Sequence, residues 1–159
     1  PNLRSLTQAI FYPGVALAEA SNVSVGRGTE SPFELLGAPW IDAEGLAGYL
    51  RDRQLPGVEF EPVRFRPASG RFKGEACHGV RLALKDRDRL DAVRLGIEIL
   101  CALQRLHPGR FEIDKALGMV GSRAVLQGIK EGLDPEAIAA SWQPQLDEFL
   151  KRRESYLLY

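Results

Sequence analysis

The alternation of apolar and polar residues predicts two strands in the middle of the chain. His78, Val80, Leu82 and Leu84 occupy every second position, so they lie on one face of a strand. His78 is therefore expected to point the same way as the core residues. Residues 58–65 alternate as well, but the inward parity shifts by one at Pro62. That shift predicts a bulge or bend in this strand.

A period of three to four residues predicts helices on both sides of these strands. One helix begins after Asp42 and ends near residue 53, and a second, apolar around most of its circumference, spans about 90–106. Two short helices follow, at about 114–119 and 122–131, joined at Gly121. The last helix begins at Asp134-Pro135, an N-cap followed by proline at the first helical position. It is expected to kink near Gln143, because Pro144 cannot donate its backbone hydrogen bond.

The first forty residues show no comparable period. Tyr12-Pro13-Gly14 indicates a turn, and residues 15–18 form either a short buried strand or one turn of helix. Residues 21–40 are rich in Gly and Pro and predict a long ordered loop, a kind of segment that is usually functional in compact domains. Together the elements predict an α+β fold, with a small mixed or antiparallel sheet packed by helices and a long C-terminal helix.

Composition narrows the class of protein. The chain has 159 residues, of which 45% are hydrophobic and 26% charged, as expected for one compact domain with a core. Basic and acidic residues number 21 each, so no overall field attracts the chain to nucleic acid or to an anionic membrane. It contains no apolar run of the roughly 20 residues that a membrane span needs. No signal peptide is recognisable, and the start without Met indicates a piece of a longer protein or a processed chain.

The predicted loop contains the first candidate site. Residues 24–29 read Ser-Val-Gly-Arg-Gly-Thr, so the guanidinium of Arg27 lies between two glycines. Backbone amides and a bidentate donor can then approach the same anion or carbohydrate oxygen. The alternative is a purely structural turn. The segment lacks the lysine of a Walker A loop and the third glycine of a dinucleotide fingerprint, so we expect no cofactor.

The residues around this loop add the groups that a sugar site uses. Glu19 and Asn22 precede it, and Phe33 and Trp40 follow it. Carboxylate, amide and hydroxyl groups form hydrogen bonds with sugar hydroxyls, while aromatic rings stack on sugar faces. The structural interpretation stays open here too, with Phe33 and Trp40 in the core and Asn22 capping a turn.

A second dense segment covers residues 72–79. It places Glu75, Cys77 and His78 within four residues. Adjacent strand residues point to opposite faces, so Cys77 and His78 cannot act as a nucleophile and its base. Two His and two Cys without ligand spacing do not make a structural zinc site, so no metal is expected. His78 is either a buried structural histidine or a hydrogen-bond partner for substrate, while Cys77 and Cys101 are predicted to be buried thiols.

These segments together resemble one family. The resemblance is carried by Glu19 to Thr29, Pro32-Phe33, Gly37 to Trp40, Lys73-Gly74-Glu75-x-Cys77-His78-Gly79 and the closing Tyr156-Leu157-Leu158-Tyr159. They are similar to the family first catalogued as domain of unknown function 1343, known through NamZ-type exo-β-N-acetylmuramidases. The match spans the whole chain in order. Proteins of that family are about twice this length, so the chain resembles their C-terminal part.

The resemblance implies a function in cell-wall degradation. Residues 1–159 would be a single domain, the C-terminal cleft-closing and substrate-binding part of a longer two-domain peptidoglycan glycosidase. Its partners would be a glycan ending in N-acetylmuramic acid and an upstream Rossmann-like domain that carries the catalytic glutamate, outside the cytoplasm. Such a chain alone would be catalytically incomplete. The alternative functions are a stand-alone cell-wall glycan or anion-binding module and a structural module.

The two lines of reasoning give one set of candidate substrate-binding residues. Muramic acid carries a lactyl carboxylate, which a guanidinium between two glycines is suited to hold. Arg27 is therefore the leading candidate. The complete set is Glu19, Asn22, Ser24, Arg27, Gly28, Thr29, Glu75 and His78.

Overall fold

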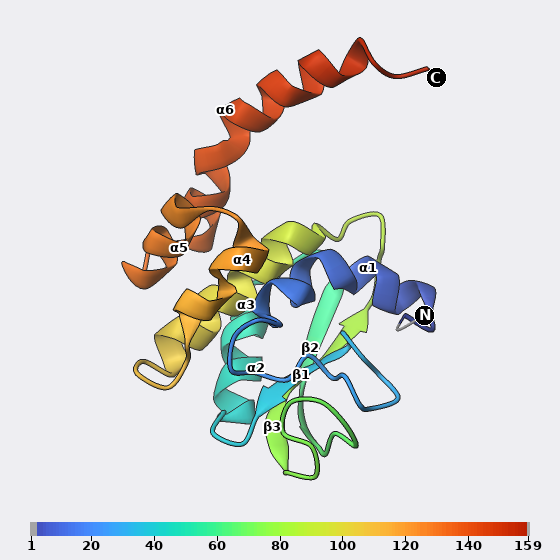
Figure 1. The fold of residues 1–159 in the computed structure, drawn as a ribbon, viewed down its shortest axis with the longest axis vertical. Coiled ribbons are helices and arrows are strands. Elements are labelled where there is room, and N and C mark those ends of the chain that lie inside the picture. Colours follow the sequence, from blue (N-terminus) through green and yellow to red (C-terminus); the bar gives the residue numbers. More distant parts are fainter. Residues whose placement is uncertain (1–2, 159) are drawn as a thin grey trace.

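The structure, a computed structural model that describes residues 3–158, contains a three-stranded antiparallel sheet covered by helices (Figure 1). The strands are β1 (Leu35–Ala38), β2 (Val58–Phe65) and β3 (Cys77–Leu84), and β3 lies between the other two. Leu36 and Pro62 both pair with Val80, and Phe60 pairs with Leu82. The α+β prediction with a small antiparallel sheet is confirmed.

Of the bulge or bend predicted at Pro62, the bulge is wrong. β2 pairs with β3 without interruption, from Val58 opposite Leu84 to Phe65 opposite Cys77. Val58 and Phe60 face the core, whereas Phe65 lies on the opposite face, against Gly37. On that opposite face, Val63 and Phe65 are half-buried and pair with the buried Gly79 and Cys77 of β3. The change of parity in the sequence therefore marks the point where the opposite face of β2 becomes partly covered, so the strand needs no bulge to shield Val63 and Phe65.

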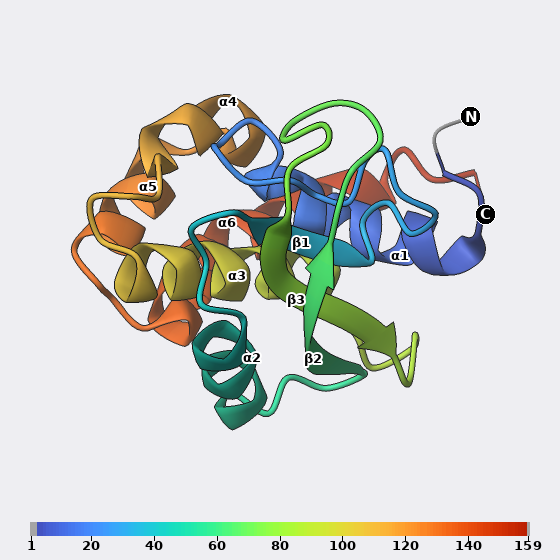
Figure 2. The same cartoon turned by 90° about the horizontal axis from the view of Figure 1, so that it is seen from below.

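Helix α3 (Ala92–Leu106) forms the centre of the helical layer. It begins with the side chain of Asp91 accepting a hydrogen bond from the Arg94 amide, and its middle residues are fully buried. α2 (Ala43–Asp52) lies beside the sheet, while α1 (Leu6–Val15) and α3 lie behind it (Figure 2). The predicted helices near 42–53 and 90–106 are confirmed, the second beginning two residues later than expected.

The predicted turn at Tyr12-Pro13-Gly14 is wrong, because all three residues belong to α1. A Cβ atom on Gly14 would lie 1.9 Å from the Ala92 carbonyl oxygen, and one on Gly96 would lie 2.5 Å from the Gly14 oxygen. The two helices therefore touch backbone to backbone. Gly14 serves this close contact, and the following 3₁₀ turn η1 (Ala16–Ala18) confirms the helical alternative for residues 15–18.

Short helices follow the central one, as predicted. They are η2 (Ile113–Ala116), α4 (Leu117–Val120) and α5 (Arg123–Lys130), and Gly121 ends α4 at a positive φ of 71°. α6 (Pro135–Glu154) begins as expected, with the Asp134 carboxylate accepting a hydrogen bond from the Glu136 amide at 2.9 Å. Its first half packs on α3, and its second half extends away from the body (Figure 1). Within residues 3–158, no helix is long and apolar enough to span a membrane.

Three helices meet at one ion cluster, which we call the Arg53 cluster: Arg53, Glu98 and Asp134. Arg53 follows α2, and its Nε donates to Glu98 Oε2 of α3 at 2.8 Å. Its Nη1 donates to Asp134 Oδ2, at the start of α6, at 3.1 Å. The Glu98 side chain is 0% exposed, and its hydrogen bonds with Arg53 raise the pKa of that guanidinium. The cluster thus ties α2, α3 and α6 together.

Candidate functional site

Residues 19–34 form an ordered loop that is attached to the edge of the sheet. The Ser24 amide donates to the Gly37 carbonyl at 2.8 Å, and the Gly37 amide donates back at 2.9 Å. Gly26 then turns the chain with φ 78°, and its amide donates to Ser24 Oγ at 3.2 Å. The predicted loop over 21–40 is correct except at its end, where Leu35–Ala38 forms β1. That strand is buried on both faces, so it shows no alternation in the sequence.

Arg27 is held in place by two neighbours. Its Nε and Nη2 donate to the two carboxylate oxygens of Glu19, with 3.2 Å between Nη2 and Oε2. Its Cζ lies 4.9 Å from the ring centroid of Phe33, a cation–π contact. The hydrogen bonds with Glu19 raise the pKa of Arg27, so the guanidinium is charged at any physiological pH. One edge of the guanidinium is used by Glu19, which leaves Nη1 for a further acceptor.

Arg27 lines a pocket of about 450 Å³, which we call the Arg27 pocket. This volume is within the range that holds small ligands, and it accommodates one sugar ring. The Arg27 and Glu19 side chains are 37% and 28% exposed, so the pair is accessible from solvent. The residues that line the pocket are Arg4, Arg27, Gly28, Thr29, Glu30, Pro32, Ser69 and Gly70.

Five of the eight residues that line this pocket come from outside the predicted set. Arg4 enters from the segment before α1 and pairs with Glu30 at 3.5 Å. Ser69 and Gly70 come from the connection between β2 and β3, which is attached where the Ala68 amide donates to the Gly28 carbonyl at 2.8 Å. No local pattern in the sequence links these segments to residue 27, because they meet only in the folded chain.

The other polar residues of the loop are engaged with backbone. Ser24 is buried, and Thr29 Oγ1 donates to the Gly26 carbonyl at 2.7 Å while accepting from the Ser31 amide at 3.1 Å. Asn22 Nδ2 donates to the Arg110 carbonyl at 2.8 Å, and its Oδ1 accepts from the Glu112 amide at 2.9 Å.

These bonds fix the loop and connect it to the segment before η2. Phe33 is fully buried, which agrees with the core alternative for this ring. A direct contact of Asn22 or Ser24 with substrate stays a prediction.

His78 lies elsewhere, on the core-facing side of β3, as predicted. It is half-buried, opposite Arg64 of β2 and Ala38 of β1. With Arg64, and with Asp42 and Glu44 at the start of α2, it lines a second pocket of about 430 Å³. This pocket shares no lining residue with the Arg27 pocket. The structure therefore separates His78 from Arg27, although both belong to the predicted set.

Glu75 belongs to neither pocket. It lies exposed in the turn that precedes β3. Burial, and secondarily the charge of Glu75, raises the pKa of Cys77 to about 11. The structure thus brings together Glu19, Arg27, Gly28 and Thr29, and it leaves Glu75 apart from them.

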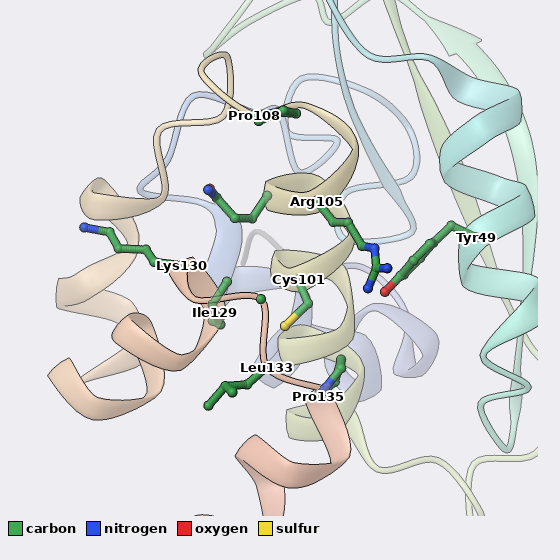
Figure 3. Close-up of a pocket in the computed structure, with 10 residues that line it drawn as sticks. Tyr49, Cys101, Arg105, Pro108, Ile129, Lys130, Leu133 and Pro135 are labelled. Atoms are coloured by element: carbon green, nitrogen blue, oxygen red, sulfur yellow. The ribbon is translucent and has the colours of Figure 1, made fainter.

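A third pocket, of about 360 Å³, lies between α3 and the connection from α5 to α6 (Figure 3). Arg105 and Tyr49 approach each other at one end, and Cys101 lies in the wall. Burial raises the pKa of Cys101 to about 12, so its thiol stays protonated at neutral pH. Both cysteines are free and buried, as predicted, and neither has the thiolate character of a nucleophile.

Comparisons with known proteins point to one family. The family model described as exo-beta-N-acetylmuramidase NamZ, C-terminal, matches residues 10–159. Peptidoglycan beta-N-acetylmuramidase NamZ of Bacillus subtilis (strain 168) is 36% identical over 165 residues, covering 100% of this chain and 39% of the relative. The chain therefore spans about two fifths of the length of that relative.

Two crystal structures of DUF1343 family proteins from Bacteroides fragilis share the fold. The first has a TM-score of 0.79 and 25% identity, over 95% of this chain and 42% of the other. The second has a TM-score of 0.74 and 27% identity, over 100% of this chain and again 42% of the other. Both solved relatives, like the curated one, are more than twice as long as the stretch that this chain matches.

Proposed function

The chain belongs to the family of NamZ C-terminal domains, and from this membership we propose that it is the substrate-binding part of a peptidoglycan-degrading glycoside hydrolase. The proposed reaction is the release of N-acetylmuramic acid from the end of a cell-wall glycan. The proposed substrate lies in the cell wall, so the protein would work outside the cytoplasm. The rest of the longer protein would supply the other wall of the active-site cleft.

The observation that supports this proposal is the fixed position of the Arg27 guanidinium at the rim of a pocket large enough for one sugar ring. Glu19 and Phe33 fix its position, and Gly28 and Thr29 lie beside it. N-acetylmuramic acid differs from N-acetylglucosamine by a lactyl ether that ends in a carboxylate. A fixed guanidinium with a free Nη1 gives a charge-assisted hydrogen bond to that carboxylate alone. Arg27 would then select muramyl ends over glucosaminyl ends.

The catalytic acid is proposed to lie outside this chain. Glycoside hydrolysis usually needs two carboxyl groups on either side of the scissile bond. In the Arg27 pocket, Glu30 is paired with Arg4, and the nearby Glu19 is occupied by Arg27. Among residues 3–158, no unpaired carboxylate lines this pocket. The chain alone is therefore expected to bind a muramyl end without cleaving it.

The test is a change of Arg27 in the full-length enzyme. Arg27→Ala is expected to lower kcat/KM for a disaccharide that ends in N-acetylmuramic acid by about 10- to 100-fold, the range expected for one hydrogen bond to a charged group. Activity on the matched N-acetylglucosaminyl disaccharide should change little. Arg87→Ala is the control, because Arg87 is also a paired surface arginine but lies away from the pocket. An unchanged preference in Arg27→Ala would show that Arg27 does not read the lactyl group.

A further inference from the structure

Within the described residues 3–158, nothing in the body of the protein buries the second half of α6. Trp142 is the last residue of the helix that packs against the core. Every residue from Gln143 to Leu158 is exposed. This part of the helix projects away from the body of the protein, and we call it the arm (Figure 1). Pro144 lies at the point where packing ends, and it removes one hydrogen bond from the helical ladder.

The arm carries an apolar stripe, which we call the distal α6 stripe: Leu146, Phe149 and Leu150. Their spacing of three and four places them on one helical face, where they are 39%, 56% and 40% exposed. Glu148 and Lys151 lie on the opposite face. Helices shorter than about 12–15 residues are marginal in water, and this arm has about three turns beyond Pro144. An apolar face of this kind is typical of a helix that lies in the groove of a partner.

The partner favoured by the structure is the preceding part of the same polypeptide. The family model describes a C-terminal segment, and the curated relative has 61% of its length outside the stretch that this chain matches (100% less 39%). In both views the start of the described chain and the end of the arm lie on the same side (Figures 1 and 2). Leu6, the first residue of α1, is 64% exposed near that start. A domain that precedes this chain would therefore enter on the side of the molecule toward which the arm extends (Figure 1).

We propose that the distal α6 stripe docks into an apolar groove of the domain that precedes this chain in the longer protein. The contact fixes the Arg27 pocket relative to the catalytic carboxylate of that domain. This inference rests on the proposed function, which supplies the preceding domain. A second copy of this chain is the competing occupant, and the test separates the two.

The test is amide hydrogen exchange in the full-length protein. Residues 145–154 are expected to be protected, and Leu146→Ser/Leu150→Ser should speed their exchange at least ten-fold. The matched control is Glu148→Ser/Lys151→Ser, because it replaces two equally good helix formers by serine on the opposite face. The control should keep the protection. Equal exchange in wild type and in Leu146→Ser/Leu150→Ser overturns the proposal, as does equal loss of protection in the control.

Two further readouts make the outcome unambiguous. Protection that rises with protein concentration, together with a dimer in sedimentation, identifies a second copy as the occupant and overturns the proposal. Activity on the muramyl disaccharide is measured on the same samples. If the enzyme is active but the arm is not protected, the docking proposal is wrong and the proposed function stands. If the arm is protected but the enzyme is inactive on muramyl ends, the proposed function is wrong and the docking proposal stands.

Discussion

Arg27 and Arg53 each donate two hydrogen bonds to one glutamate, Glu19 and Glu98 respectively. The Glu98 side chain is 0% exposed, and Asp134 from a third helix completes the Arg53 cluster. The Glu19 side chain is 28% exposed, and its pair with Arg27 opens onto a pocket of about 450 Å³. The same chemistry thus occurs once between packed helices and once at the rim of a cavity.

The difference shows that a bidentate ion pair does not by itself mark a binding site. The Arg53 cluster uses both edges of its guanidinium for protein carboxylates, so it joins elements. Arg27 uses one edge for Glu19 and lies between Gly26 and Gly28, whose positive φ angles of 78° and 81° bend the loop around it. A free edge and an open pocket give Arg27 the means to bind an external anion.

Removing the buried glutamate is expected to have the largest effect. Glu98→Ala leaves Arg53 without its main partner and opens space in a packed core, which typically costs about 3–5 kcal/mol. Arg53 retains Asp134 and is 25% exposed, so the lower end of this range is expected. Glu19→Ala is the matched change at the exposed pair and should cost less than about 1 kcal/mol. Urea denaturation of the 159-residue chain measures both, and similar losses would erase the contrast between the two pairs.

A smaller loss of stability is expected when Gly28, in the loop that carries Arg27, is replaced by alanine. Gly28 has φ 81°, and a Cβ atom there would lie 2.4 Å from the Ser69 carbonyl oxygen. Gly28→Ala should therefore cost about 2–3 kcal/mol, at the upper end for a residue forced into this conformation. Gly70→Ala is the control, because Gly70 has φ 75° with nothing within 4 Å of its Cβ position. Gly70→Ala has the backbone strain of a positive φ but no steric clash. It should therefore cost about 1 kcal/mol, the lower end of the range for such strain.

Equal denaturation midpoints for Gly28→Ala and Gly70→Ala would mean that the contact between the Arg27 loop and the β2–β3 connection is soft. The Arg27 pocket would then be mobile where the Arg53 cluster is fixed. A larger loss of stability in Gly28→Ala than in Gly70→Ala would mean that Arg27 and Arg53 both lie in rigid surroundings. The two arginines would then differ only in their access to solvent.

The helices after residue 40 could be predicted from the sequence because their signals are local, whereas α1 (Leu6–Val15) was not predicted. Asp91, Ser122 and Asp134 each accept a hydrogen bond from the amide two or three residues on. Such caps are legible in a few residues of sequence. The failures came from contacts between distant segments. The turn predicted at Gly14 is wrong because no residue near it in the sequence indicates its contact with α3. β1 escaped detection because both its faces are buried.

The candidate site divides in the same way. Glu19, Arg27, Gly28 and Thr29 could be grouped because they fall in one short loop, where sequence neighbours stay spatial neighbours. Arg4, Ser69 and Gly70 could not, since the fold alone brings them to the pocket. The orientation of His78 could be predicted from strand parity, but its distance from Arg27 depends on how the loop crosses the sheet edge.

The smallest expected effect concerns the acid side of the Arg53 cluster. The hydrogen bond from the Glu136 amide, and then that from Arg53, hold the pKa of Asp134 below its ordinary value. A depressed pKa in the folded state means that the unfolded chain binds more protons, so this stability is present above about pH 3.9 and is lost as the pH falls through the folded pKa. Asp134→Asn should therefore flatten the fall of unfolding free energy between about pH 4 and pH 2, measured by urea titration with pH 7 as the reference. Because Asp134 is 53% exposed, solvent screens the effect. Parallel pH profiles for Asp134→Asn and wild type would show that the Asp134 carboxylate adds no pH-dependent stability. The cluster would then depend on the Glu98–Arg53 pair alone, as the Arg27 site depends on Glu19–Arg27.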